Sequence, residues 1–192
     1  MTRRLVATAV ISGCLLSLGG IPPVASADST RTITPQVDFF MESVKDKEKQ
    51  KKVSKVMKTL RSRVHKTSYV SSGSSIYGWD CSGLVRWFYE QLGVGVPHSA
   101  NVQAHIGKRV SKPQVGDIVV FARSGSTDFY HSGIYIGNRK VLNANRYYGT
   151  TVVEPLSDYK SSQIRFVRVD LNCWNNYETE TQAIENCERS ER

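Results

Sequence analysis

The order of the local sequence patterns limits the fold of this chain more than any other feature, because helical spacing comes first and strand spacing follows. Between residues 44 and 65, apolar residues recur at helical intervals. A second helical pattern begins at Cys81 and stops at Gly93. Strand patterns then cover residues 118–122, 131–137, 141–145, 150–153 and 164–169. We therefore expect an α+β fold, with N-terminal helices packed on an antiparallel sheet of about five strands.

The chain is long enough for one domain with a single core, since it has 192 residues of which 40% are hydrophobic. We expect this domain to span residues 44–171. A polar linker at residues 28–43 precedes it, and an acidic tail at residues 172–192 follows it.

The first 27 residues have the features of a secretion signal. Two arginines precede an apolar stretch, and Ala25-Ser26-Ala27 provides a small-residue cleavage site. The alternative is a lipoprotein signal, in which Cys14 would be acylated. We expect a protein exported to the cell wall or beyond, with no membrane-spanning segment in the mature chain.

Three cysteines remain when the leader is removed, and export would place them in an oxidising compartment. The simplest arrangement pairs Cys173 with Cys187 and leaves Cys81 as a free thiol. Closing that loop of about 15 residues would stabilise the fold by roughly 3 kcal/mol. Such a pairing requires the tail to turn back on itself, because a continuous helix would hold the two residues about 21 Å apart.

The charge balance favours anionic partners. The formal net charge is +9, and removal of the two leader arginines leaves 24 basic and 17 acidic residues, or +7. Outside a cell, anionic wall polymers are better candidates than nucleic acid. The sequence contains no cluster with metal-ligand spacing, so we expect no metal or other cofactor.

Cys81 is the best candidate for a nucleophile. Asp80 is placed to cap the helix, and Cys81 falls in its first turn, where unpaired backbone N–H groups favour negative charge. We therefore expect the pKa of this thiol to be lowered and the thiolate to act as the nucleophile.

A thiolate nucleophile needs a base, and histidine has the side chain best suited to that role. His131 begins a strand after a polar loop, where side chains converge on a cleft, so it is the best candidate among four histidines. We expect His65 to be a cation in the last turn of its helix, and His98 and His105 to be surface residues.

The imidazole base must be oriented by a third group. With a hairpin turn at residues 137–139, the numbers of facing residues sum to 276. His131 then faces Asn145, and Asn143 faces Gly133, diagonal to His131 on the same face of the sheet. Geometry admits either asparagine.

Four segments in this order and spacing resemble the NlpC family of cell-wall cysteine endopeptidases. They are residues 80–85 (DCSGLV), 96–97 (VP), 115–121 (VGDIVVF) and 131–137 (HSGIYIG), and the similarity runs from roughly residue 50 to residue 170. The resemblance implies a papain-like fold and hydrolysis of peptide bonds in the peptidoglycan stem, commonly the bond from D-Glu to the diamino acid.

By position, the resemblance assigns Cys81 as nucleophile, His131 as base and Asn143 as the orienting residue, where the family usually has histidine. Tyr69 matches a family tyrosine that helps to bind the oxyanion. Residues 71–73 (SSG) replace the family's Trp-Gly-Gly. Two alternatives are a wall-binding or regulatory protein with little turnover, and an amidase or acyltransferase that uses the same cysteine.

Overall fold

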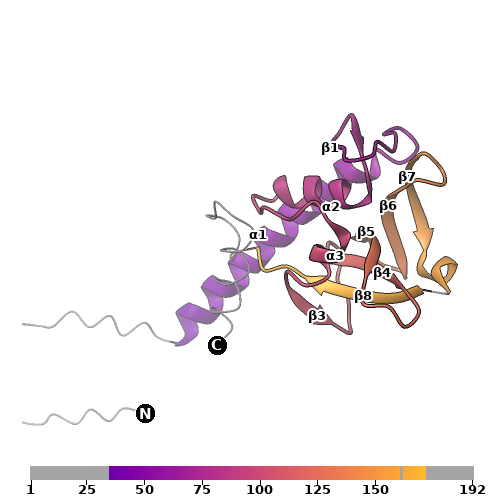
Figure 1. Ribbon diagram of the computed structural model, residues 1–192. Coiled ribbons are helices and arrows are strands. Elements are labelled where there is room, and N and C mark those ends of the chain that lie inside the picture. Colours follow the sequence, from indigo (N-terminus) through magenta and orange to yellow (C-terminus); the bar gives the residue numbers. More distant parts are fainter. Residues whose placement is uncertain (1–34, 161, 172–192) are drawn as a thin grey trace, which may run out of the picture.

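The computed structural model describes residues 35–160 and 162–171, which form helices on one side of an antiparallel sheet (Figure 1). The predicted signal sequence, Cys14, the acidic tail and the Cys173–Cys187 pair all lie outside the described residues. The elements are α1 (Pro35–Arg61), β1 (Ser74–Ser75), β2 (Gly78–Trp79), α2 (Cys81–Glu90), α3 (Ala100–Gln103), β3 (Lys108–Val110), β4 (Ile118–Arg123), β5 (Phe129–Tyr135), β6 (Lys140–Asn145), β7 (Thr150–Pro155), the 3₁₀ helix η1 (Leu156–Tyr159) and β8 (Ser162–Arg168).

Helix α1 begins earlier than expected, at Pro35, inside the segment predicted to be a linker. Proline is well suited to the first position of a helix, because its fixed φ is helical and the N–H that it lacks would have no partner there. Residues 36–61 contain no glycine or proline that would end the helix. Near its C-terminal end, Met57 and Leu60 are buried, while Lys55 and Lys58 are exposed.

Helix α2 forms as predicted. The Asp80 side chain accepts a hydrogen bond from the Gly83 backbone N–H at 2.8 Å, which caps the helix. Leu84, Val85 and Phe88 are fully buried on the face turned to the sheet. After the helix, Gly93 has a φ of +85°, a backbone conformation that glycine adopts readily.

The main sheet has six strands in the order β3-β8-β4-β5-β6-β7, and all its strand pairs are antiparallel. The predicted α+β class is confirmed, and the additional strand is the short β3. Figure 1 shows α1 and α2 together at one side of this sheet, with the β6–β7 hairpin at its far edge.

Alternate residues of the strands enter two different apolar clusters. Ile118, Val120 and Ala122 of β4 pack with α1 and α2, whereas Val119 and Phe121 pack with Leu156 on the opposite face. This period of two is the pattern from which the strands were predicted.

The predicted hairpin register is confirmed. Ile134 pairs with Leu142 and Tyr135 with Val141, so the numbers sum to 276. Asn138 and Arg139 both have positive φ, as the tight turn between twisted strands requires.

Two short elements complete the fold. The segment between α1 and α2 contains the hairpin β1–β2, and η1 follows β7 directly. In the part of the chain that the structure describes, none of the helices combines the length and apolar character needed to cross a membrane.

Candidate active site

Cys81 lies at the first position of α2 as a free thiol. Its pKa is raised above the ordinary value of 9.0, chiefly because burial disfavours the charged thiolate, and the charge of Asp80 adds to this. Backbone N–H groups of Ser132, Ser82 and Cys81 itself act in the opposite direction. The predicted lowering of this pKa was therefore wrong in sign, because the helix terminus contributes as expected but burial outweighs it.

The Cys81 sulfur connects α2 with strand β5. The backbone of Ser132 donates a hydrogen bond toward it, and Ser132 directly follows His131. The ladder pairs between β5 and β6 are Ile134–Leu142 and Tyr135–Val141, so Ser132 lies beyond the stretch of β5 that pairs with β6. The geometry therefore brings the thiol to the segment of β5 that carries the predicted base.

His131 lies among aromatic rings of β4 and η1. Its ring centroid is 5.5 Å from that of Phe121 and 6.1 Å from that of Tyr159, whose plane is inclined to it by 17°. Burial lowers the pKa of His131 below 6.5, although the hydrogen bond with Asn143 and the charge of Glu154 act to raise it. The imidazole is therefore neutral at neutral pH.

The structure distinguishes between the two candidate asparagines. Oδ1 of Asn143 lies 3.1 Å from Nε2 of His131, and Asn143 is fully buried. The Asn145 side chain instead donates to Glu154 at 3.0 Å. Of the two residues that hairpin geometry admitted, Asn143 is the one that contacts the imidazole.

Gly133 allows Asn143 of β6 to lie close to strand β5. A Cβ atom at position 133 would lie 2.8 Å from the Asn143 Cβ and 2.6 Å from Cγ2 of Val141. Such contacts are shorter than real side chains tolerate, so a residue without a side chain is required here.

Glu154 and Tyr159 belong to the same group of contacts, and sequence reasoning missed both. Oε2 of Glu154 accepts hydrogen bonds from Asn143 at 2.8 Å and from the Tyr159 hydroxyl at 2.8 Å. The available signal was an acidic residue within an otherwise uncharged strand pattern at residues 150–154.

Tyr69 is half-buried and close enough to Cys81 for an electrostatic effect between them. Its pKa is raised chiefly by burial and also by electrostatic interaction with Cys81 and Asp80, while Arg146 lowers it. The backbone N–H of Tyr69 donates to the Gly149 carbonyl at 2.9 Å, which ties this segment to the turn after β6. The phenol remains a protonated hydrogen-bond donor at neutral pH.

The prediction that His98 is a surface residue was wrong. Its Nε2 lies 2.9 Å from Oδ1 of Asp80, and only 21% of its side chain is exposed. Burial acts to raise the pKa of Asp80, but hydrogen bonds from Gly83, His98 and Ser82 hold it below its ordinary value. His98 therefore fixes the capping carboxylate beside the nucleophile. By contrast, His65 and His105 are exposed.

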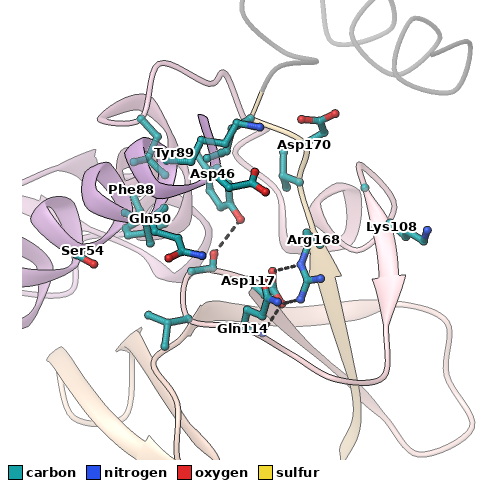
Figure 2. Close-up of a pocket in the computed structure, with 18 of the residues that line it drawn as sticks. Asp46, Gln50, Ser54, Phe88, Tyr89, Lys108, Gln114, Asp117, Arg168 and Asp170 are labelled. Carbon is teal, nitrogen blue, oxygen red and sulfur yellow. Dashed lines mark hydrogen bonds and ion pairs between the residues drawn. The ribbon is translucent and has the colours of Figure 1, made fainter. Parts of the chain in front are cut away.

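A separate cavity of about 700 Å³ lies between α1, the end of α2 and β8. Figure 2 shows Asp117 paired with Arg168 at its wall, and Nη2 of Arg168 is 2.8 Å from the carboxylate. The Tyr89 hydroxyl donates to the Gly116 carbonyl in the same wall. None of the predicted site residues lines this cavity, so its described contacts are those of a structural ion pair.

The described geometry permits nucleophilic chemistry of the thiol–imidazole kind. A buried thiol lies beside the strand that carries a neutral imidazole, and a buried amide holds that imidazole. A phenol and a helix N-terminus provide hydrogen-bond donors close to the sulfur.

Comparison with known proteins gives matches to one family. The model of the NlpC/P60 family matches residues 66–169. The chain is 44% identical over 87 residues to the murein DD-endopeptidase MepS/murein LD-carboxypeptidase of Escherichia coli, covering 44% of this chain and 45% of that protein. It is 36% identical over 104 residues to the gamma-DL-glutamyl hydrolase of Bacillus subtilis, covering 52% of this chain and 25% of that protein. The chain thus spans less than half the length of either relative.

Solved structures share the fold. The peptidoglycan hydrolase RipB of Mycobacterium tuberculosis superimposes with a TM-score of 0.55 at 24% identity, covering 63% of this chain and 66% of RipB. RipD of the same organism, described as a non-catalytic NlpC/p60 domain protein adapted to peptidoglycan binding, gives a TM-score of 0.52 at 20% identity, covering 62% of this chain and 97% of RipD.

Proposed function

Because the chain belongs to the NlpC/P60 family, we propose that it is an exported cysteine endopeptidase that hydrolyses peptide bonds in the stem peptides of peptidoglycan. The bond from D-Glu to the diamino acid is the proposed target. The observation that carries the proposal is the meeting of α2 and β5, where the Cys81 thiol accepts from the backbone of Ser132 beside His131. The names of the relatives, a murein endopeptidase and a gamma-glutamyl hydrolase, support the substrate class.

In the proposed reaction, the Cys81 sulfur attacks the carbonyl carbon of the scissile bond as its proton passes to His131. The raised pKa of the thiol and the lowered pKa of the imidazole favour a resting pair in which both groups are neutral. Proton transfer therefore accompanies attack, and the Ser132 N–H stabilises charge on the sulfur.

The carbonyl oxygen becomes an oxyanion when the sulfur adds. We assign its stabilisation to the Cys81 backbone N–H at the start of α2 and to the Tyr69 hydroxyl, which remains protonated. His131 then gives its proton to the leaving amine, and the thioester remains on Cys81. Water, activated by His131, hydrolyses the thioester and regenerates the thiol.

We propose peptidoglycan stem peptides as the partner of the active site, with anionic wall polymers attracted to exposed lysines of α1 such as Lys55 and Lys58. The predicted leader at residues 1–27 would deliver the protein to that compartment. The proposal requires no metal or organic cofactor, since the nucleophile, base and oxyanion donors are all side chains and backbone of this chain.

The test is digestion of purified peptidoglycan under reducing conditions, with mass spectrometry of the released fragments. We expect fragments cut after D-Glu from the wild type and none above background from Cys81→Ala. Equal release by both proteins would rule out the enzymatic proposal. Fragments cut at the sugar linkage would indicate an amidase, and transferred peptides would indicate an acyltransferase.

A wall-binding protein with little turnover is the second candidate, and the raised pKa of Cys81 favours it. The same fold occurs in RipD, which is described as non-catalytic. This candidate predicts that peptidoglycan pulls down wild type and Cys81→Ala equally while neither releases fragments. Wild-type cleavage would exclude it.

A further inference from the structure

Glu154 is a buried carboxylate directly behind the orienting asparagine. It is 9% exposed, and its Oε2 accepts three hydrogen bonds: from Nδ2 of Asn143 at 2.8 Å, from Nδ2 of Asn145 at 3.0 Å and from the Tyr159 hydroxyl at 2.8 Å. Burying a carboxylate is costly, and three donors on one oxygen offset that cost. None of these three hydrogen bonds goes to His131, so any effect of Glu154 on the imidazole passes through another residue.

The hydrogen-bond donors and acceptors of Glu154, Asn143 and His131 fit only one arrangement of protons. An ionised carboxylate can only accept, so Glu154 requires the NH₂ group of Asn143 to face it. Oδ1 of Asn143 must then face His131, and it lies 3.1 Å from Nε2. A carbonyl oxygen can only accept, so Nε2 of His131 must carry a proton. In the neutral imidazole, Nδ1 is then the unprotonated nitrogen.

We infer that Glu154 is a positioning residue which, through Asn143, fixes the proton of His131 on Nε2 and so makes Nδ1 the base. The inference rests on the proposed function, because the choice of nitrogen matters only if His131 accepts a proton from Cys81.

An orienting asparagine needs a partner that fixes which end of its amide faces the histidine. Its amide has nearly the same shape when rotated by 180°, which exchanges the oxygen and the nitrogen. In the rotated state Nδ2 would donate to Nε2 of His131, the proton would move to Nδ1, and the base would be lost. The negative charge of Glu154 disfavours that rotation.

Tyr159 contacts both Glu154 and His131, the first and last residues of this hydrogen-bonded series. Its hydroxyl donates to Glu154, and its ring lies 6.1 Å from the His131 ring at an interplanar angle of 17°. The residue that stacks against the imidazole therefore also satisfies the carboxylate that directs the amide. Asn145 also donates to Glu154, and neither of its described hydrogen bonds goes to His131.

The protonated nitrogen can be read directly by two-bond ¹H–¹⁵N correlation spectra of the ¹⁵N-labelled protein, with His131 assigned by the signals lost in His131→Ala. We expect the wild type to show a single Nε2–H form at pH 7.5. A wild-type Nδ1–H form overturns the inference by itself. In Glu154→Gln, whose amide can donate or accept, we expect a mixture of both forms or a shift to Nδ1–H.

The matched control is Glu90→Gln, which makes the same carboxylate-to-amide change at an exposed residue paired with Arg86. It should keep the wild-type spectrum, and Glu154→Asp, which remains an acceptor only, should also keep Nε2–H. An unchanged His131 spectrum in Glu154→Gln overturns the inference.

With a soluble stem peptide, we expect kcat of Glu154→Gln to fall by at least about 10-fold, with KM changed by less than about 2-fold. Glu90→Gln should match the wild type. Equal kcat in Glu154→Gln and Glu90→Gln would overturn the inference. The spectra report on the resting protein, so they decide it even if no peptide is cleaved, and the two failures remain distinguishable.

Discussion

Nε2 of His131 lies 3.1 Å from Oδ1 of Asn143, although the two residues belong to different strands. This contact depends on three features of the β5–β6 hairpin: its turn, its register and the missing side chain at Gly133. A polar contact built on the short turn at residues 137–139 is held in a fixed place, so it can orient the imidazole.

Removal of the Asn143 amide should slow the reaction without unfolding the protein. We expect Asn143→Ala to lower kcat by about 10- to 100-fold, because the imidazole loses the group that orients it. Asn143→His places at this position the residue that the family usually has, and should retain more activity than Asn143→Ala. Rates on a soluble stem peptide check this, and wild-type kcat in Asn143→Ala would show that the contact has no role in the reaction.

Sequence reasoning succeeded where the relevant geometry is local. The turn at residues 137–139 fixes the register of its two strands, so the proximity of His131 and Asn143 follows from the chain between them. The Asp80 cap and the burial of α2 likewise depend on residues within a few positions of one another. These are the parts of the site that periodicity and capping rules describe well.

The parts that were missed depend on contacts between distant segments. Glu154 contacts Asn143 only because β7 pairs with β6, and it contacts Tyr159 only because η1 follows β7. His98 meets Asp80 because the segment after α2 returns to the start of that helix. The sign of the Cys81 pKa shift depends on how deeply the fold buries the sulfur, which spacing along the chain does not reveal.

Gly133→Ala should destabilise the fold. The added Cβ would lie 2.6 Å from Val141 Cγ2 and 2.8 Å from the Asn143 Cβ, so β5 and β6 would have to separate locally. We expect a loss of about 1–3 kcal/mol, measured by urea denaturation. Gly95→Ala is the matched control, since its Cβ would meet nothing within 4 Å. Equal losses in the two variants would contradict the close approach described here.

The pH dependence of the rate should show an acid limb below pH 6.5. Burial lowers the pKa of His131 from 6.5, and only the neutral imidazole can accept the thiol proton. Activity therefore rises as pH increases through this lowered pKa and is lost as pH falls below it. The measurement is kcat/KM between pH 4 and pH 9. An acid limb centred above pH 6.5 would contradict the burial-dominated environment.

Alkylation of Cys81 in the resting protein should be slow at neutral pH. Burial raises the pKa of the thiol above 9.0, so the reactive thiolate forms only at higher pH. We expect the rate of iodoacetamide labelling, followed by mass mapping of the Cys81 peptide, to rise with a midpoint above pH 9. A free cysteine peptide labelled under the same conditions is the reference. A midpoint below that of the peptide would instead indicate a preformed thiolate–imidazolium pair.

Loss of the Asp80 side chain should loosen the start of α2 and displace the nucleophile. Its carboxylate accepts from the backbone of Gly83 at 2.8 Å and of Ser72 at 2.9 Å, and it contacts His98 at 2.9 Å. We expect Asp80→Ala to cost about 1–2 kcal/mol of unfolding free energy, as removal of an N-cap does, and to lower kcat as well. Asp80→Asn keeps an oxygen for the Gly83 N–H and should recover most of the stability.

Asp128→Ala, at an exposed loop position, is the control for loss of a carboxylate alone. If Asp80→Ala and Asp128→Ala unfold at the same urea concentration, the cap does not stabilise the helix that presents Cys81.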